Sequence, residues 1–364
     1  MNPTTKETTT LWIGTYPDNA PAGSGEGIWH VNLDLRTGEL SGQHLAITTP
    51  APSFLAQHPN GHALYAVNET EVGEVSAFAI SASHDGPPTL VPYGPQPTQP
   101  TNGSYPCHIV ARHDSLWIAN YGNGTFTSIP LNQHAEMNGA PQSFTHHGQG
   151  PNRTRQEGSH AHFVDEVDGT AWVTDLGTDE IRRYRLFPDH LEPDGIAATL
   201  PRGSGPRHFV TYTTGIITVT ELDCALHVLN RDTDGSFRVT ATFPATKVDA
   251  GNPLNLPSHI ARNEDGSRVY TAIRGTDTLS VFAVAHNDGL LTTEPLAEFP
   301  TGGSWPRHFA VIPSADNHAD FIITANQYSS NLTVLRIDRK TGAGQLLDSI
   351  EIPAPACVLH SSRG

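Results

Sequence analysis

Two neighbouring stretches of the chain, SHAHFVDEVDGTAWVTDLG at 159–177 and GPRHFVTYTTGIITVTELD at 205–223, follow one pattern. Each opens with a small residue followed by histidine and phenylalanine, runs through a short apolar segment and a polar turn, and ends in a second run suited to a strand. The same pattern recurs in four further segments, which begin at Pro52, Pro106, Pro257 and Trp305. A repeat of fixed period is typical of solenoids, propellers and other arrays.

The repeats align on one aromatic position. It is occupied by Phe54, His108, His162, His208, His259 and His308, at spacings of 54, 54, 46, 51 and 49 residues. Each pair of runs is followed by a third alternating run, such as VSAFAI at 75–80, and by a looser fourth run. Alternation with β-branched and aromatic residues favours strand over helix. Four strands in about 50 residues predict one blade of a β-propeller.

The two ends of the chain supply the remaining blade. LWIGTYP at 11–17 and IWHVNLD at 28–34 resemble a second and a third strand without a first, and PACVLHSS at 355–362 resembles a first strand without a second. We therefore predict an all-β, seven-bladed propeller of four-stranded blades, closed by pairing of the N- and C-terminal strands in one blade. Closure would remove exposed strand edges. We expect residues 1–10 to be a disordered tail and residues 11–364 to be a single propeller domain.

The charge balance excludes several classes of partner. The chain has 21 Lys+Arg against 37 Asp+Glu, a net charge of −16, whereas a general nucleic-acid or anionic-membrane binder has a basic footprint.

No stretch approaches the roughly 18 apolar residues of a membrane span. Cys107, Cys224 and Cys357 lie far apart without a CxxC pair, which favours a reducing compartment. We expect a cytoplasmic protein whose partners include neither nucleic acid nor membrane; its oligomeric state is left open.

The repeat places polar side chains at two points that a blade brings together. The first strand of a blade is innermost and the second runs antiparallel to it, so the start of the first lies beside the end of the second. Two sets of residues should therefore share the mouth of the central channel: His162, Arg207, His208, His259, Arg307 and His308 from the starts, and Glu69, Asn120, Asp175, Glu221, Arg274 and Asn326 from the ends. A polar ring around a concave mouth is a natural candidate site.

Some of these residues have a purely structural explanation. A histidine that recurs from blade to blade can tie each blade to its neighbour by hydrogen bonds, and this applies to His108, His208, His259 and His308. Buried thiols at Cys107 and Cys224 would be inert. The other positions of this ring can be either structural or functional.

Four positions depart from the repeat. His162 is the second member of a doublet with His160. Arg207 and Arg274 are inner arginines of an acidic chain, so each needs an acidic partner or an anionic ligand. Glu221 is either their salt-bridge partner or a general base. These four residues are our candidates for chemistry.

Two Pro/Gly-rich insertions interrupt the period. The first spans Gly94–Tyr105, and the second spans Ala135–Gly158 and carries Arg153 and Arg155 just before the histidine doublet. The second is either a variable surface loop or a lid over the channel mouth. There is no GxSxG nucleophile elbow and no Cys/His cluster with zinc spacing, so we expect neither a metal nor a cofactor.

Several of the quoted phrases resemble one known family. The repeated P-x-H starts, LYAVNE at 64–69, HAHFV at 160–164 with VTDLGTDEIRRYRL at 173–186, and PSHIA at 257–261 are similar to the lactonase-type seven-bladed propellers. That family includes the propeller form of bacterial 6-phosphogluconolactonase and the fungal 3-carboxy-cis,cis-muconate cyclase. In the cyclase branch the proposed site is one histidine, two arginines and one glutamate, without a metal. By similarity these are His162, Arg207, Arg274 and Glu221.

The resemblance implies an enzyme that acts on an anionic lactone. The leading hypothesis is hydrolysis of 6-phosphoglucono-1,5-lactone to 6-phosphogluconate, with His162 or Glu221 as general base and the two arginines as anion clamps. His160 and the remaining ring residues would bind substrate. The alternatives are a lactone-forming cycloisomerase, a calcium-dependent lactonase with Glu69, Asn120, Asp175 and Asn326 as ligands, and a binding propeller without catalysis.

Overall fold

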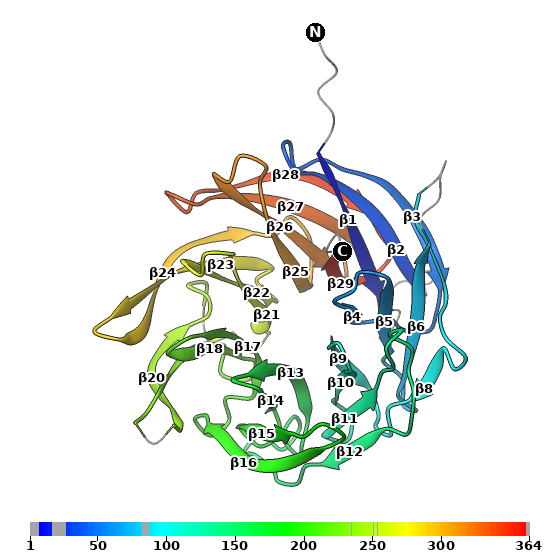
Figure 1. The fold of residues 1–364 in the computed structure, drawn as a ribbon. Helices are drawn as coiled ribbons and strands as arrows, with labels where there is room; N and C mark the ends of the chain where they lie inside the picture. The colour runs from blue at the N-terminus through cyan, green and yellow to red at the C-terminus, as the bar shows by residue number, and fades with distance from the viewer. Residues whose placement is uncertain are drawn as a thin grey trace.

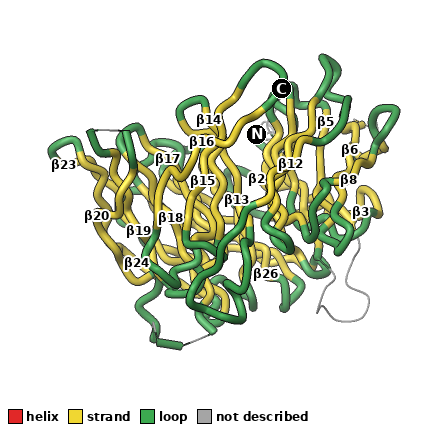
Figure 2. Tube along the Cα trace, turned by 90° about the horizontal axis from the view of Figure 1, so that it is seen from below, coloured by secondary structure: helices red, strands yellow, loops and turns green. Residues whose placement is uncertain are grey.

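Seven β-sheets surround a common axis in this protein (Figure 1). The computed structural model describes residues 7–16, 27–81, 87–233, 235–249, 251–252 and 254–361. Strands run between two faces made of turns and loops (Figure 2). Within the described residues no helix is long and apolar enough to cross a membrane. The predicted all-β, seven-bladed propeller is confirmed.

The blades are numbered here along the chain, with strands given from the axis outward. Blade 1 contains β29 (Pro355–His360), β1 (Thr8–Thr15), β2 (Gly27–Asp34) and β3 (Leu40–Thr48). Blade 2 contains β4 (Leu55–Gln57), β5 (Ala63–Asn68), β6 (Glu74–Ser81), β7 (Thr89–Pro92) and β8 (Thr98–Pro100). Blade 3 contains β9 (Pro106–Ala111), β10 (Ser115–Asn120), β11 (Thr125–Pro130) and β12 (Gln142–Thr145).

The other four blades repeat this order. Blade 4 contains β13 (Ala161–Val167), β14 (Thr170–Asp175), β15 (Glu180–Leu186) and β16 (Leu191–Thr199). Blade 5 contains β17 (Pro206–Tyr212), β18 (Gly215–Thr220), β19 (Ala225–Arg231) and β20 (Phe237–Pro244). Blade 6 contains β21 (Leu256–Arg262), β22 (Arg268–Arg274), β23 (Thr278–Asn287) and β24 (Leu290–Pro300), and blade 7 contains β25 (Pro306–Pro313), β26 (Ala319–Asn326), β27 (Asn331–Asp338) and β28 (Gly344–Glu351).

The two ends of the chain close the ring, as predicted. β29 is the innermost strand of blade 1 and pairs antiparallel with β1, with Leu11 opposite His360 and Ile13 opposite Val358. β1 begins at Thr8, so the last three residues of the predicted tail 1–10 belong to this strand, while residues 1–6 lie outside the described residues.

The first insertion differs from the loop expected for Gly94–Tyr105. Its residues Thr98–Pro100 form β8, which pairs with the first half of β6, whereas β7 pairs with the second half. The two short strands thus divide between them the outer edge that a single fourth strand covers in the other blades.

The packing of the blades explains the sequence patterns. Second strands such as β5 and β18 are buried along their whole length, because neighbouring blades cover both of their faces. Outer strands such as β20 alternate between buried or partly buried positions and exposed ones, as expected where one face meets water. The apolar core lies between blades: Leu11 and Val358 of blade 1, for example, pack in one cluster with Phe321 of blade 7.

Six of the seven inner strands carry a one-residue irregularity near their start. In blade 5, Pro206 pairs with Thr220 and His208 with Val219, which leaves Arg207 without an opposite residue. The same step leaves out Cys107, His162, Ser258, Arg307 and Ala356 in their blades. A bulge of this kind re-aims a side chain, and such bulges are frequent beside active sites.

Deletion of residues 355–364 tests the closure. The truncated chain lacks β29, which exposes the inner edge of β1 and opens the cluster that contains Val358. We expect a loss of several kcal/mol and a melting temperature lowered by more than about 10 °C, or aggregation, in thermal unfolding followed by circular dichroism. A truncated protein that melts like the full-length chain would contradict the closure.

Candidate active site

Six aromatic rings plug the centre of the propeller. They come from the same register position of six blades, and neighbouring ring centroids lie 4.0–5.1 Å apart around a closed circuit of Phe54, His108, Phe163, His208, His259 and His308. The blade 4 member is Phe163, which pairs with Thr174 as His208 pairs with Val219. The sequence alignment, which placed His162 there, was therefore wrong by one residue in this blade.

The plug histidines are uncharged and form the floor of the mouth. Burial lowers the pKa of His208 and His259 well below the ordinary value, and it lowers that of His308 to about 3. Nδ1 of His208 lies 2.8 Å from Nδ1 of His259, and Nδ1 of His308 accepts from the main-chain N–H of Val358 in the neighbouring blade. This agrees with the structural explanation; direct substrate binding by His208, His259 and His308 stays a prediction.

The bulged residues stand one step above the plug. Five of them line a cavity of about 10 Å³ together with Ser53, which precedes the plug residue Phe54 in blade 2: Cys107, His162, Arg207, Arg307 and Ala356. The remaining walls are Phe54, His208 and His308. A cavity of about this size holds one water molecule. The displaced register of blade 4 thus places His162, and not Phe163, at the same level as the two arginines.

In three blades, the residue predicted to reach the mouth from the end of the second strand lies one position too early in the chain. Asn120, Asp175 and Asn326 occupy the last strand position and are 0% exposed. Each is engaged inside its own blade: Asn120 and Asn326 donate to Thr127 and Thr333, and Asp175 accepts from main-chain N–H groups. These three residues do not line the mouth, because one step along a strand turns a side chain to the opposite face.

The next position along the chain is the one that reaches the mouth. Glu69 and Glu221 follow the last residues of β5 and β18, and Arg274 follows Ile273, which pairs with Pro257 as Thr220 pairs with Pro206. The position that Asn120 was expected to fill is taken by Tyr121.

The central feature of the mouth is a cluster of three guanidinium groups around one carboxylate, which we call the Glu221 cluster. Oε2 of Glu221 lies 3.1 Å from Nε of Arg207 and 2.8 Å from Nη2 of Arg274. Oε1 accepts from Nη2 of Arg155 at 2.6 Å, and the same Nη2 donates to the phenol oxygen of Tyr121 at 3.2 Å.

The electrostatics of the cluster favour an anionic ligand. Burial acts to raise the pKa of Glu221, but Arg274, Arg155 and Arg207 outweigh it and hold that pKa well below its ordinary value. Burial, together with Arg274 beside it, lowers the pKa of Arg207 to about 9, so the guanidinium stays charged at neutral pH. Three cations against one anion leave two positive charges in excess, inside a chain of net charge −16.

Arg307 forms a separate, neutralised pair. Its Nη2 lies 3.2 Å from both carboxylate oxygens of Glu69, and its guanidinium covers the ring of Tyr16. Both charged side chains are mostly buried. Arg307 and Glu69 therefore lie at the mouth as predicted, but they balance each other's charge.

The two members of the histidine doublet point to different places. Nδ1 of His162 lies 3.4 Å from Nη1 of Arg207 and 3.7 Å from Sγ of Cys107. Burial, and Arg207 beside it, lower the pKa of His162 well below 6.5, so its ring is neutral. His160 instead stacks on Tyr121 and bonds to its carbonyl and to Glu157, so it takes no part in lining the central cavity.

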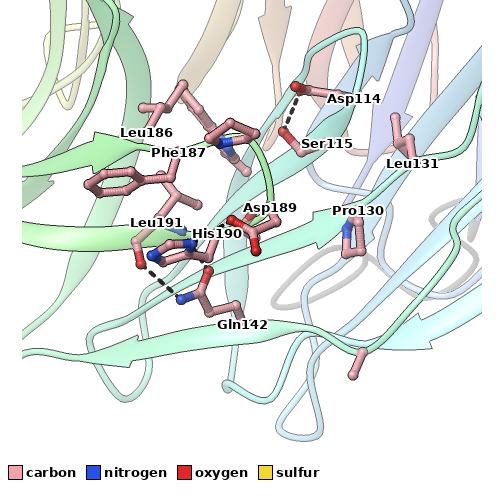
Figure 3. A pocket seen from close by; sticks show the side chains of 14 residues that line it. Asp114, Ser115, Pro130, Leu131, Gln142, Leu186, Phe187, Asp189, His190 and Leu191 are labelled. Carbon is pink, nitrogen blue, oxygen red and sulfur yellow. Dashed lines mark hydrogen bonds and ion pairs between the residues drawn. The ribbon is translucent and has the colours of Figure 1, made fainter.

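A larger concavity between blades 3 and 4 offers less chemistry (Figure 3). It has a volume of about 270 Å³, and its polar groups pair with one another. Gln142 exchanges two hydrogen bonds with the main chain of Leu191, and Asp114 accepts from Ser115. No buried charged side chain lines it, so the mouth is the stronger candidate for an active site.

The described residues contain no group of three or more His, Cys, Asp or Glu side chains placed to hold a metal ion. Of the residues weighed as calcium ligands, Asn120, Asp175 and Asn326 lie inside separate blades, and Glu69 is paired with Arg307. That alternative ligand set is therefore not brought together.

The structure places three residues at the mouth beyond the predicted set. Arg155 belongs to the insertion predicted to be a surface loop or a lid, and Ser53 and Tyr121 are outside the predicted site. The position before each plug residue indicates Ser53, and the position after each second strand indicates Tyr121. The position of Arg155 depends on how its loop folds, for which the repeat gives no signal.

Comparisons with known proteins agree with this architecture. The family model described as "Lactonase, 7-bladed beta-propeller" matches residues 10–360. A 6-phosphogluconolactonase from Bacillus subtilis (strain 168) is 29% identical over 357 residues, which cover 95% of this chain and 97% of that protein. One from Formosa agariphila is 28% identical and covers 93% and 95%. The solved structure of a protein from Lactobacillus plantarum has a TM-score of 0.84 at 26% identity and covers 97% and 99%.

Replacement of the central carboxylate tests the Glu221 cluster. Glu221→Gln leaves three arginines without their anion, and removal of one partner of a buried ion pair costs about 3–5 kcal/mol. Because the pKa of Glu221 is lower in the folded chain than its ordinary 4.5, the carboxylate stabilises the fold fully above that pH and progressively less below it. The deficit of the variant in urea unfolding should thus be largest near pH 7 and shrink below about pH 4.5.

Glu157→Gln is the matched control, because that side chain is 57% exposed and contacts His160 rather than the arginines. It should unfold like the unmodified protein at every pH. An equal effect of the two substitutions would refute a special role for Glu221.

Proposed function

Because the chain belongs to the lactonase family of seven-bladed β-propellers, we propose that it hydrolyses a sugar lactone, with 6-phosphoglucono-1,5-lactone as the leading substrate. The observation that carries the proposal is the Glu221 cluster, with its two excess positive charges beside a neutral histidine and a water-sized cavity. The relatives named 6-phosphogluconolactonase support the same substrate class.

The cluster suits an anionic substrate for a simple reason. Arginine binds phosphate and carboxylate through a planar fork of N–H donors, and charge-assisted bonds of this kind are among the stronger ones. Glu221 fixes the three guanidinium groups before substrate arrives, so little ordering is left for the binding step. Its own oxygens are occupied by arginine, and its pKa is low, which makes it a poor base.

We assign the general base to His162. A guanidinium can only donate, so the Nδ1 atom that faces Nη1 of Arg207 is the unprotonated nitrogen of the ring. The cavity beside it is large enough for one water molecule. Ser53, which lines the same cavity and is 2% exposed, has a hydroxyl without a hydrogen-bond partner among the described residues. A water there would bond to the Ser53 hydroxyl, and it would donate to Nδ1 of His162 once Nη1 of Arg207 turns away from the ring.

The hydrolysis then balances without a metal. Nη1 of Arg207 turns its N–H from the ring of His162 to the lactone carbonyl oxygen, which frees the lone pair of Nδ1. The water oxygen then attacks the carbonyl carbon while its proton passes to Nδ1, and Arg207 stabilises the negative charge that develops on the carbonyl oxygen. When the tetrahedral intermediate collapses, the bond to the ring oxygen breaks and the proton returns from His162 to that oxygen. The product is the open-chain hydroxy acid. Arg207 lowers the pKa of His162, and the negative charge that develops on the carbonyl oxygen offsets Arg207, so His162 becomes more basic when it must act.

The expected cytoplasmic location and the absence of nucleic-acid and membrane partners stay predictions. A cycloisomerase would use the same groups to hold carboxylates and move a proton, and a binding propeller would use them without turnover.

A lactone panel tests the proposed function. Purified protein should hydrolyse 6-phosphoglucono-1,5-lactone above the spontaneous rate, at the same rate with and without EDTA, in an assay that follows proton release. Turnover that chelator abolishes and calcium restores would shift the assignment to a calcium lactonase. No turnover of any sugar lactone, together with lactone formation from a carboxymuconate, would overturn hydrolysis in favour of the cycloisomerase.

The pH profile tests His162 as the base. Because its pKa lies well below 6.5, kcat/KM for the unphosphorylated glucono-1,5-lactone should be level over roughly pH 6 to 8 and fall only at lower pH. His162→Ala should lower kcat by about 100-fold or more. His160→Ala, which removes the other member of the doublet, should have a far smaller effect. An inflection above pH 6.5, or equal losses in the two variants, would assign the base elsewhere.

A further inference from the structure

Arg155 is held over the mouth by a segment of chain that buried hydrogen bonds fix in place. It lies on the connection between β12 and β13, and its neighbour Gln156 is 0% exposed. The Gln156 side chain donates to the carbonyl of Leu176 and to Oδ1 of Asp179, and its own oxygen accepts from the N–H of Asn152. This part of the second insertion is thus fixed to blade 4, which gives the Arg155 side chain a defined starting point.

Arg155 differs from the other two arginines of the cluster in exposure. Its side chain is 34% exposed, against 5% for Arg207 and 9% for Arg274. One nitrogen, Nη2, makes both of its hydrogen bonds, to Glu221 and to Tyr121. Its Nε and Nη1 atoms have no partner in the part of the chain that the structure describes, so these donors are available to a ligand.

Tyr121 adds a second donor at the same point. Its oxygen accepts from Arg155, which leaves its own O–H free to donate. Burial raises the pKa of Tyr121, so the phenol stays protonated at neutral pH. The outer edge of the cluster therefore offers guanidinium and phenol donors to one anionic group.

We infer that Arg155, supported by Tyr121, is the residue that selects phosphorylated over unphosphorylated lactones. This rests on the proposed function: the reactive carbonyl lies deep, beside His162 and Arg207, and the phosphate on its exocyclic carbon lies outward, against Arg155. A phosphate monoester carries up to two negative charges, which matches the two excess positive charges of the Glu221 cluster.

The test compares Arg155→Gln with Arg153→Gln, a matched control that removes the same charge from an exposed position of the same loop. kcat/KM is measured for 6-phosphoglucono-1,5-lactone and for glucono-1,5-lactone. Arg155→Gln should lower the ratio of the two values by at least about tenfold, mostly through KM of the phosphorylated lactone, because one charge-assisted contact is lost. Arg153→Gln should leave the ratio unchanged. Equal losses for both lactones in Arg155→Gln, or an unchanged ratio, would overturn the inference.

A binding measurement separates this inference from the proposed function. Isothermal titration calorimetry, in which 6-phosphogluconate or gluconate is titrated into the protein, measures binding and needs no turnover. Weaker binding of 6-phosphogluconate alone to Arg155→Gln would support the phosphate site even if the unmodified protein hydrolysed neither lactone. The opposite result is also informative. If the unmodified protein hydrolyses lactones, and Arg155→Gln binds 6-phosphogluconate with the same affinity as the unmodified protein, the phosphate site is wrong and the proposed function stands.

Discussion

The buried carboxylate of Glu221 is the interaction on which the mouth depends. Three guanidinium groups would repel one another in so confined a space, and burial alone would be costly for each. Glu221 contacts all three and is itself kept ionised by them. Arg207 and Glu221 come from blade 5, Arg274 from blade 6, and Arg155 from the connection between blades 3 and 4. One carboxylate thus ties together parts of the molecule that are far apart in sequence.

The periodic architecture supplies two layers from two adjacent positions. The aromatic position of each inner strand fills the axis, and the bulged position before it faces the space above. The plug is uncharged and its rings lie in contact, so it forms the floor beneath the charged layer. Each blade can therefore vary its bulged residue without disturbing the plug, and the chain places cysteine, histidine and arginine there in successive blades.

The fold, the closure and the shared location of Arg207, Arg274 and Glu221 could be predicted from the sequence, because strand alternation and repeat spacing report directly on blade geometry. The prediction failed at single-residue register. Blades 4 and 5 share the same bulge, but the adjacent His-Phe pair of blade 4 begins at the bulged position and that of blade 5 one residue later. Matching the two pairs therefore placed His162 in the plug instead of Phe163. Asn120, Asp175 and Asn326 were placed at the mouth, although they belong inside their blades. Arg155 was not identified because its position follows from the buried anchor of Gln156, which only the folded chain reveals.

The most direct test of this account is a crystal structure with 6-phosphogluconate, the product of the proposed reaction. The account predicts that the phosphate contacts Arg155 and Tyr121 at the outer edge of the Glu221 cluster, with the carboxylate inward beside Arg207 and His162. Binding in the concavity between blades 3 and 4, or a mouth that stays free of product at millimolar concentration, would contradict it.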